Sequence, residues 1–307
     1  MSTPFDYQAL LDETLREAKK QGERGQVASY IPELRKADPN MAGIALMTTR
    51  GIFTAGDTAV NFTLQSISKV LTLLLALEHR GVEAVFAKVG SEPTGDSFNS
   101  IVKLETSEQK PLNPMINAGA IAVCSLLPGQ SVEERFGLIA DLLEKILGRP
   151  VQIDESVYRS EKETGHRNRA LAHFLKDIHA LEGDVEEVLD LYFRQCSILV
   201  NCADLARIGM FLAAKGINEA GKPIVSANAG RLVSTFMVTC GMYNGSGEFA
   251  IKVGIPAKSG VAGGILGVVP GRYGVATYGP ALDRKGNSVV GISMLRRLSQ
   301  VLDLSIF

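Results

Sequence analysis

Residues 64–77 read LQSISKVLTLLLAL, and this stretch decides the fold and the chemistry that we expect. Its second half is almost continuously apolar, which predicts a helix buried on all sides. Ser66 and Lys69 are three positions apart at the start of this helix, so they share one face. Ser66 would lie in the first turn, where free backbone N–H groups stabilise developing negative charge. Burial would lower the pKa of Lys69, and a lysine of this kind can activate a serine as a nucleophile.

The spacing S-x-x-K is a weak signal on its own. It occurs twice more, at Ser100/Lys103 and Ser107/Lys110, in a polar stretch without a buried helix. Taken alone, the serine of the first pair could be a helix N-cap. Its lysine could be a surface side chain that lies along a core helix.

Residues 258–269 read KSGVAGGILGVV and hold the only K-[ST]-G of the chain. Gly260 would admit the close approach of a ligand or another backbone. The charge of Lys258 would keep a nearby Lys69 neutral. The N–H groups of Ser66 and Val261 could together form an oxyanion hole. The alternative is a glycine-rich hairpin with an exposed lysine.

The composition is that of an ordinary globular protein. The chain has 307 residues, of which 46% are apolar and 21% charged, and its formal net charge is −1. This balance gives no long-range attraction for nucleic acid or for anionic membranes. The longest apolar run, residues 70–77, is far shorter than the roughly 20 residues of a membrane span. The N-terminus lacks the pattern of a secretory signal. We therefore expect a cytoplasmic protein that binds neither nucleic acid nor membrane.

The cysteines and histidines show no metal-ligand spacing. No C-x-x-C and no H-E-x-x-H pattern occurs. We expect reduced, buried thiols and no zinc site. The residues concerned are Cys124, Cys196, Cys202, Cys240, His79, His166, His173 and His179.

Strand patterns lie at both ends of the chain, and helical patterns lie between them. We expect strands at 43–49, 51–55, 249–255, 261–269, 273–278 and 288–292, and helices that include 5–24, 132–147, 202–215 and 294–303. Short connections near the C-terminus predict an antiparallel sheet. The order of elements predicts a discontinuous α/β sheet domain, residues 1–64 and 218–307, around an all-helical domain, residues 65–217.

An S-x-x-K followed by a K-[ST]-G, with helices inserted between them, is the order found in serine β-lactamases and penicillin-binding proteins. The expected fold class is therefore α/β and like that of these proteins, with an antiparallel sheet flanked by helices and an inserted helical domain. The lack of a signal peptide and of an S-D-N tripeptide argues against a β-lactamase or transpeptidase activity.

From about residue 25 to residue 297, the chain resembles the serine-dependent glutaminases, which share the β-lactamase-like fold. The motifs that carry this resemblance are YIPEL at 30–34, QSISK at 65–69, PLNPMINAGA at 111–120, YFRQCS at 192–197, GMYNGSG at 241–247 and KSGV at 258–261. The ankyrin repeats of the animal enzymes are absent, so the chain resembles the short bacterial form.

The resemblance implies hydrolysis of L-glutamine to L-glutamate and ammonia, with no metal or organic cofactor, by a homotetramer. It implies that Ser66 is the nucleophile and Lys69 its base. Tyr192 and Lys258 are further candidate catalytic residues. The implied substrate-binding residues are Tyr30, Ser66, Asn117, Glu161, Asn168, Tyr192, Tyr243 and the backbone of Val261.

These residue types can bind a substrate such as glutamine, which is a zwitterion that carries an amide. Glu161 could pair with the α-ammonium group, and Asn117, Asn168 and tyrosine hydroxyls could donate to the α-carboxylate. Each also has a structural alternative. Glu161 could be solvated in a charged loop, Asn117 could cap a helix, Tyr192 could be helix packing, and Tyr243 could be a turn residue.

Two other functions stay open on this fold. One is hydrolysis of a different amide or ester, because a fold does not determine an activity. The other is a catalytically inactive sensor or assembly protein, against which the presence of Ser66, Lys69 and Lys258 argues.

Overall fold

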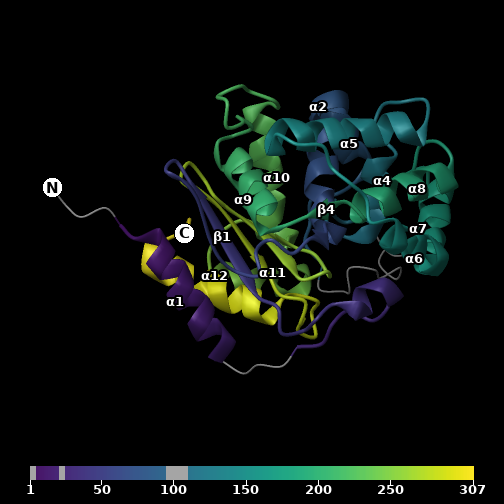
Figure 1. The fold of residues 1–307 in the computed structure, drawn as a ribbon. Helices are drawn as coiled ribbons and strands as arrows, with labels where there is room; N and C mark the ends of the chain where they lie inside the picture. Colours follow the sequence, from purple (N-terminus) through teal and green to yellow (C-terminus); the bar gives the residue numbers. More distant parts are fainter. Residues whose placement is uncertain (1–4, 21–24, 95–109) are drawn as a thin grey trace.

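A five-stranded antiparallel sheet joins the two ends of the chain. The structure, a computed structural model, describes residues 5–20, 25–94 and 110–307. Strands β1 (Gly43–Thr48) and β2 (Gly51–Gly56) come from the N-terminal part, and β5 (Ala257–Ser259), β6 (Gly264–Val269) and β7 (Tyr273–Tyr278) from the C-terminal part. Their order is β2-β1-β7-β6-β5. Strand β1 therefore pairs with β7, although the two lie near opposite ends of the sequence (Figure 1).

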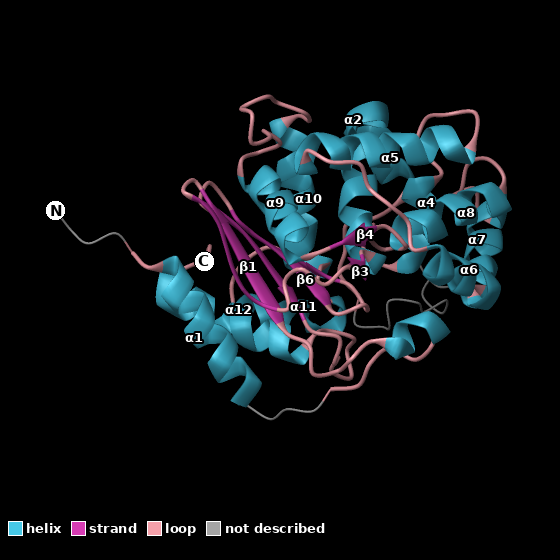
Figure 2. Cartoon of the chain, viewed as in Figure 1, coloured by secondary structure: helices cyan, strands magenta, loops and turns pink. Residues whose placement is uncertain are grey.

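Helices cover both faces of this sheet (Figures 1 and 2). Helices α1 (Tyr7–Lys20) and α12 (Val289–Leu302) pack on one face, and α9 (Cys202–Ala213) packs on the other. Successive side chains of a strand point to opposite faces. Accordingly, Ile44 and Leu46 of β1 belong to the core under α1 and α12, while Ala45 and Met47 belong to the larger core on the α9 side.

The remaining helices form a group around α2 (Ser68–Lys88), which follows the 3-10 turn η2 (Gln65–Ile67). The stretch from Ser68 to Leu77 is buried throughout, as its apolar sequence predicts. The other helices of this group are α4 (Asn117–Cys124), α5 (Val132–Leu147), α6 (Glu155–Thr164), α7 (His166–Asp177), α8 (Val185–Cys196) and α10 (Ala227–Cys240). A short pair, β3 (Phe62–Thr63) with β4 (Leu199–Val200), closes this group where the chain enters and leaves it.

Several expected elements are confirmed with their caps. The β1–β2 hairpin, β7 and α5 lie where the patterns place them. Ser131 Oγ accepts from the backbone N–H of Glu134 at the start of α5, and Asn201 forms a capping box with Asp204 at the start of α9. All four cysteines are free and buried, as expected.

Two expected strands are wrong, and a third begins late. Residues 249–255 include the end of helix α11 (Ser246–Lys252), whose buried Phe249 belongs to an apolar helix face. Residues 288–292 open α12, because Ser288 Oγ accepts from the N–H of Gly291 and caps that helix. Strand β6 begins at Gly264, because residues 260–263 form a tight turn.

The helices do not divide simply at residues 65 and 217. Helix α9 belongs to the segment expected to form the helical domain, yet it packs on the sheet, whereas α10 of the outer segment packs against α2. The division into two domains therefore stays a prediction.

The S-x-x-K pairs between residues 100 and 110 lie, except for Lys110, outside the described residues, as do residues 21–24 of the expected first helix. Within the described ranges, no helix is both long and apolar enough to cross a membrane.

Two glycines let α9 lie directly on the sheet. A Cβ atom on Gly209 of α9 would lie 2.5 Å from the carbonyl oxygen of Gly267, and one on Gly274 of β7 would overlap the backbone of Ala206 and Met210. We expect Gly274→Ala to lower the free energy of unfolding by about 3 kcal/mol, because the backbone must move apart.

A matched control is Gly137→Ala in α5, where a Cβ atom meets open space. It should raise the free energy of unfolding by about 0.5–1 kcal/mol, because alanine favours a helix. Urea unfolding of the three proteins measures both effects. Equal stabilities of the two variants would show that the α9–sheet contact tolerates a side chain.

Candidate active site

Ser66 lies in a strained turn at the entry to the buried helix. It belongs to η2, and the preceding Gln65 has φ of 49°, a left-handed conformation that is uncommon for residues other than glycine. The hydroxyl of Ser68 donates to the carbonyl oxygen of Gln65 over 2.7 Å and helps to hold this turn. Strained backbone of this kind is concentrated at functional sites. Only 8% of Ser66 is exposed.

The K-S-G turn lies directly against the Ser66 turn. A Cβ atom on Gly260 would lie 2.7 Å from the carbonyl oxygen of Leu64, so only glycine fits there. Because Val261 follows Gly260, this contact places Val261 next to the Ser66 turn. Among the residues that the structure describes, none accepts a hydrogen bond from the Val261 N–H. That N–H group is therefore available to a ligand.

Lys69 is buried, and no ion pair joins it to a carboxylate of the residues that the structure describes. Only 1% of it is exposed, and burial lowers its pKa to about 8. Its Nζ donates to the carbonyl oxygen of Met115 over 3.0 Å and to Asn117 Oδ1 over 2.8 Å. Asn117 Nδ2 in turn donates to Asn168 Oδ1 over 3.1 Å. This burial shows that the alternative of a surface lysine is wrong. The alternative of Asn117 as a helix cap is also wrong, because Ile116 occupies the N-cap position of α4.

Lys258 is also fully buried, and here one expectation needs correction. We expected its charge to keep Lys69 neutral. In the structure, burial and the charge of Lys69 together lower the pKa of Lys258 far below its usual value. Burial, rather than the charge of Lys258, is what lowers the pKa of Lys69. Lys258 Nζ donates to the carbonyl oxygen of Ser259 over 2.7 Å and lies 4.5 Å from the centre of the Tyr243 ring.

Tyr243 links the K-S-G strand to the candidate nucleophile. Its hydroxyl donates to the carbonyl oxygen of Ser259 over 3.2 Å and also forms a hydrogen bond with the Ser66 side chain. A tyrosine hydroxyl has one proton to donate, so Ser66 is the donor in the second bond. Burial raises the pKa of Tyr243, which keeps this hydroxyl neutral.

Glu161 is a buried carboxyl group with a free oxygen. Only 6% of the residue is exposed on α6, so the alternative of a solvated loop is wrong. Burial raises its pKa to about 7, against the opposing effects of a hydrogen bond from the Gln65 side chain and of the charge of Lys69. Its Oε1 has no hydrogen-bond partner among the described residues. An unpartnered buried anion is costly unless a cationic ligand pairs with it.

Two tyrosines stand close to this carboxyl group. Burial and the charge of Glu161 raise the pKa of Tyr192, which lies buried on α8. Tyr30 is 56% exposed, yet its hydroxyl lies in surroundings where burial, Glu161 and Tyr243 raise its pKa. Its hydroxyl therefore lies near these two groups, although more than half of the residue is exposed. A cleft of about 850 Å³ is lined by Tyr30, Tyr243 and Val261 together with residues 282–286.

The structure thus brings together all of the residues that the sequence singles out. They are Tyr30, Ser66, Lys69, Asn117, Glu161, Asn168, Tyr192, Tyr243, Lys258 and Val261. Sequence reasoning missed Gln65 as a partner of Glu161 and the carbonyl group of Met115 as a partner of Lys69. The position of Gln65 beside Ser66 was visible, but its left-handed conformation was not.

A buried serine next to a lysine of lowered pKa, in an α/β fold with an antiparallel sheet, is typical of an enzyme that hydrolyses amides or esters. The sequence model of one hydrolase family, the glutaminases, matches residues 25–307. The chain belongs to the glutaminase family.

Individual relatives agree with this assignment. The glutaminase of Alkaliphilus oremlandii is 53% identical over 301 residues, which is 97% of this chain and 99% of that protein. The solved structure of the probable glutaminase ybaS has a TM-score of 0.93 at 41% identity and covers 99% of both chains. The covalent complex of a Bacillus subtilis glutaminase with 5-oxo-L-norleucine has a TM-score of 0.91 at 39% identity, covering 98% of this chain and 100% of that one.

The raised pKa of Glu161 makes a prediction about stability. The folded protein holds a proton on this group up to a pH of about 7, whereas an unfolded glutamate loses it near its usual value of 4.5. The contribution of Glu161 to the free energy of unfolding therefore falls as the pH rises between these values, by about 3 kcal/mol in all. We expect Glu161→Gln to match the wild type at pH 4 and to be the more stable protein at pH 8.

The exposed Glu163→Gln on the same helix serves as the control and should follow the wild type at every pH. Melting curves between pH 4 and pH 8 measure the difference. A constant gap between Glu161→Gln and the wild type would mean that the carboxyl group is not perturbed by burial.

Proposed function

We propose that this chain hydrolyses L-glutamine to L-glutamate and ammonia through an ester between Ser66 Oγ and the γ-carbonyl carbon. The observation that carries the proposal is the Lys69 amine, with a pKa lowered to about 8, behind the buried Ser66. The printed title of the Bacillus subtilis complex describes a covalent product of that glutaminase with 6-diazo-5-oxo-L-norleucine. Such a product supports covalent chemistry in a related protein.

Glu161 is the proposed partner of the α-ammonium group. Its Oε1 is buried and has no hydrogen-bond partner among the described residues. The hydroxyls of Tyr30 and Tyr192 lie close enough for the charge of Glu161 to raise their pKa values. An ammonium group would make charge-assisted hydrogen bonds with this carboxylate and would favour its ionised form. Asn117 and Asn168, which are hydrogen-bonded to each other, are the proposed partners of the α-carboxylate.

The proton of Ser66 passes to neutral Lys69, directly or through Tyr243, which already accepts a hydrogen bond from Ser66. Ser66 Oγ then attacks the amide carbonyl carbon. The N–H groups of Ser66 and Val261 stabilise the oxyanion. The C–N bond breaks, the nitrogen takes up the proton and ammonia leaves, so that a γ-glutamyl ester remains. Water, activated by Lys69 or Tyr192, hydrolyses the ester and restores Ser66.

We also propose that the fold is of the β-lactamase kind. Three observations support this: S-x-x-K opens a buried helix, K-S-G lies on the neighbouring edge strand β5, and the sheet is antiparallel. A cytoplasmic location and a homotetramer stay predictions from the family resemblance.

Removal of the nucleophile tests the reaction most simply. Ser66→Ala should lower kcat for ammonia release from L-glutamine by at least about 10⁴-fold, because the coupled serine and lysine act as a unit. The control is Ser234→Ala on α10, whose hydroxyl donates to the carbonyl oxygen of Gly230 in the same helix and which should keep full activity.

Ammonia release measured with the folded proteins decides the outcome. Wild-type activity in Ser66→Ala would exclude Ser66 as the nucleophile. An inactive wild type would point instead to another amide or ester as the substrate.

The two shifted pKa values predict the pH dependence. Glu161 must be ionised to bind ammonium, and Lys69 must be neutral to accept the proton. Their pKa values are raised to about 7 and lowered to about 8, respectively. The value of kcat/KM, which reports the free enzyme and the free substrate, should therefore rise from pH 6 to about pH 9 and fall at higher pH, where the α-ammonium group of the substrate loses its proton.

Steady-state assays with wild type and Glu161→Gln test the assignment. In Glu161→Gln, KM should be much higher, and the rise of kcat/KM near pH 7 should be absent. A wild-type profile that falls between pH 6 and pH 9 would contradict these roles.

A further inference from the structure

Tyr243 is held in an unfavourable backbone conformation beside Ser66. It opens the 3-10 turn η3 (Tyr243–Gly245) between α10 and α11, and its φ is 51°. A left-handed backbone costs a bulky residue about 1–3 kcal/mol and persists only where surrounding contacts hold it. The Tyr243 hydroxyl bonds to Ser66 and to the carbonyl oxygen of Ser259. The contacts that hold this turn therefore also determine where the hydroxyl group lies.

Hydrogen bonds on both sides of Tyr243 hold the turn. Ser246 Oγ accepts from the N–H of Met242 over 3.0 Å and donates to the carbonyl oxygen of Tyr243 over 2.9 Å. The carbonyl oxygen of Met242 accepts from the N–H of Gly245 over 2.9 Å and from Asn287 Nδ2 over 3.2 Å. The first three of these bonds lie within residues 242–246, whereas the last joins the turn to the segment before α12.

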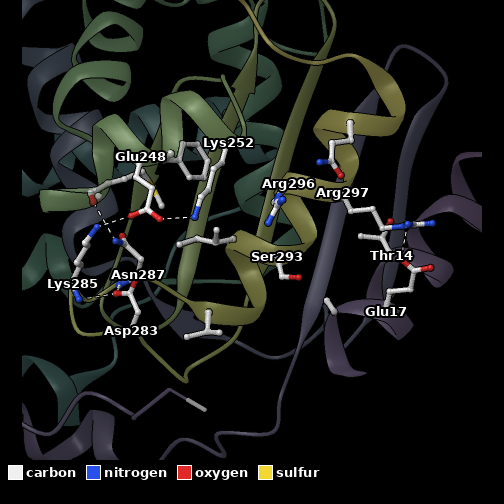
Figure 3. Close-up of a pocket in the computed structure, with 17 residues that line it drawn as sticks. Thr14, Glu17, Glu248, Lys252, Asp283, Lys285, Asn287, Ser293, Arg296 and Arg297 are labelled. Atoms are coloured by element: carbon white, nitrogen blue, oxygen red, sulfur yellow. Dashed lines mark hydrogen bonds and ion pairs between the residues drawn. The ribbon is translucent and has the colours of Figure 1, made fainter. Parts of the chain in front are cut away.

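The loop 283–287 places Asn287 against this turn. Asp283 Oδ1 accepts from the backbone N–H groups of Lys285 and Asn287, over 2.8 and 3.0 Å. The N–H of Asp283 in turn donates to the carbonyl oxygen of Asn287 over 2.8 Å. Lys285 also pairs with Glu248 of α11 over 2.7 Å, and Figure 3 shows these side chains close together beside α11. The loop is therefore fixed both by its own hydrogen bonds and by the helix that follows η3.

The same loop contacts the Tyr243 ring as well as its backbone. Gly286 has φ of 90°, and a Cβ atom on it would lie 3.5 Å from Cε2 of Tyr243. That is an ordinary van der Waals distance, so this part of the loop lies next to the ring. The loop thus adjoins the ring through Gly286 and holds the preceding carbonyl group through Asn287.

Asn287 is not explained by stability alone. It is 1% exposed, and its Oδ1 has no hydrogen-bond partner among the described residues. A buried amide with an unpartnered oxygen is less stabilising than an apolar side chain of the same shape can be. The bond from Nδ2 to the carbonyl oxygen of Met242 is what the asparagine supplies at this cost.

We propose that Asn287 is a positioning residue that keeps the Tyr243 hydroxyl at Ser66. The inference deepens the proposed function and rests on it, because it gives Tyr243 a part in the attack by Ser66. Without the Asn287 bond, the turn relaxes from the left-handed conformation and the hydroxyl group moves away from Ser66 Oγ. Asn287 thus acts through Tyr243, and its loss slows formation of the ester.

A double-mutant cycle tests whether Asn287 acts through Tyr243. Asn287→Ala should lower kcat for ammonia release from L-glutamine by about tenfold or more, because a shift of about 1 Å in a reacting group already slows catalysis strongly. In the Tyr243→Phe background, which lacks the hydroxyl group, the same change should alter kcat by less than about twofold. An equal loss in both backgrounds would overturn the proposal.

The matched control is Ser299→Ala. The buried Ser299 hydroxyl on α12 donates to the carbonyl oxygen of Val253, which follows α11, so this bond lies at the other end of α11 from Tyr243. Its loss should lower the free energy of unfolding by about 1 kcal/mol and leave kcat within about twofold. If Asn287→Ala does not fold, Asn287→Leu takes its place, because leucine has nearly the same shape as asparagine and no donor.

A spectroscopic measurement follows Tyr243 independently of the reaction. In protein that contains 3-fluorotyrosine, the fluorine NMR resonance of Tyr243 is the one that Tyr243→Phe lacks. It should shift in Asn287→Ala and stay in place in Ser299→Ala, and an unshifted resonance in the folded Asn287 variant would overturn the proposal. A wild type that releases no ammonia would defeat the proposed function instead, and the resonance would still decide whether Asn287 positions Tyr243.

Discussion

The burial of the Lys69 amine is the constraint on which the rest of the structure depends. The amine lies at the start of α2, away from water, and no carboxylate of the described chain stands within ion-pair distance of it. A lysine in such a place loses part of its affinity for the proton, and its pKa falls to about 8. The hydrogen bonds to Met115 and Asn117 replace some of the lost hydration. They also connect the start of α4 to the start of α2.

The site is built at a cost in stability. Lys69 and Lys258 are among the largest fully buried side chains of the described chain, and Glu161 is a buried acid with an unpartnered oxygen. Left-handed backbone at Gln65 and Tyr243 adds strain on both sides of Ser66. Each feature would be removed by selection for stability alone. Their presence in one place is explained by a zwitterionic substrate that pairs with the charges and by a serine that needs a base.

Local patterns predicted much of the fold, and their failures have physical causes. The hairpin of β1 and β2 and the capped helices α5 and α9 depend on short-range signals that the residues carry themselves. Residues 249–255 and 288–292 mix apolar and small residues, so their period did not distinguish a strand from a helix. The packing of their apolar side chains in the core beside the sheet favours the helical conformation. The N-cap Ser288 was a readable signal for α12 that the strand assignment overlooked. The site residues came from motifs, but the lowered pKa values of Lys258 and Lys69 depend on the extent of their burial, which only the structure supplies.

The central claim is that Ser66 is a nucleophile because Lys69 is held neutral behind it. The most direct measurement is peptide mass spectrometry after timed incubation with 6-diazo-5-oxo-L-norleucine, for wild type, Lys69→Met and the control Lys110→Met. The account predicts one adduct, on Ser66, that forms at the same rate in wild type and Lys110→Met and about a hundredfold or more slower in folded Lys69→Met. An adduct on a different residue, or equal labelling of Ser66 in folded Lys69→Met, would contradict it.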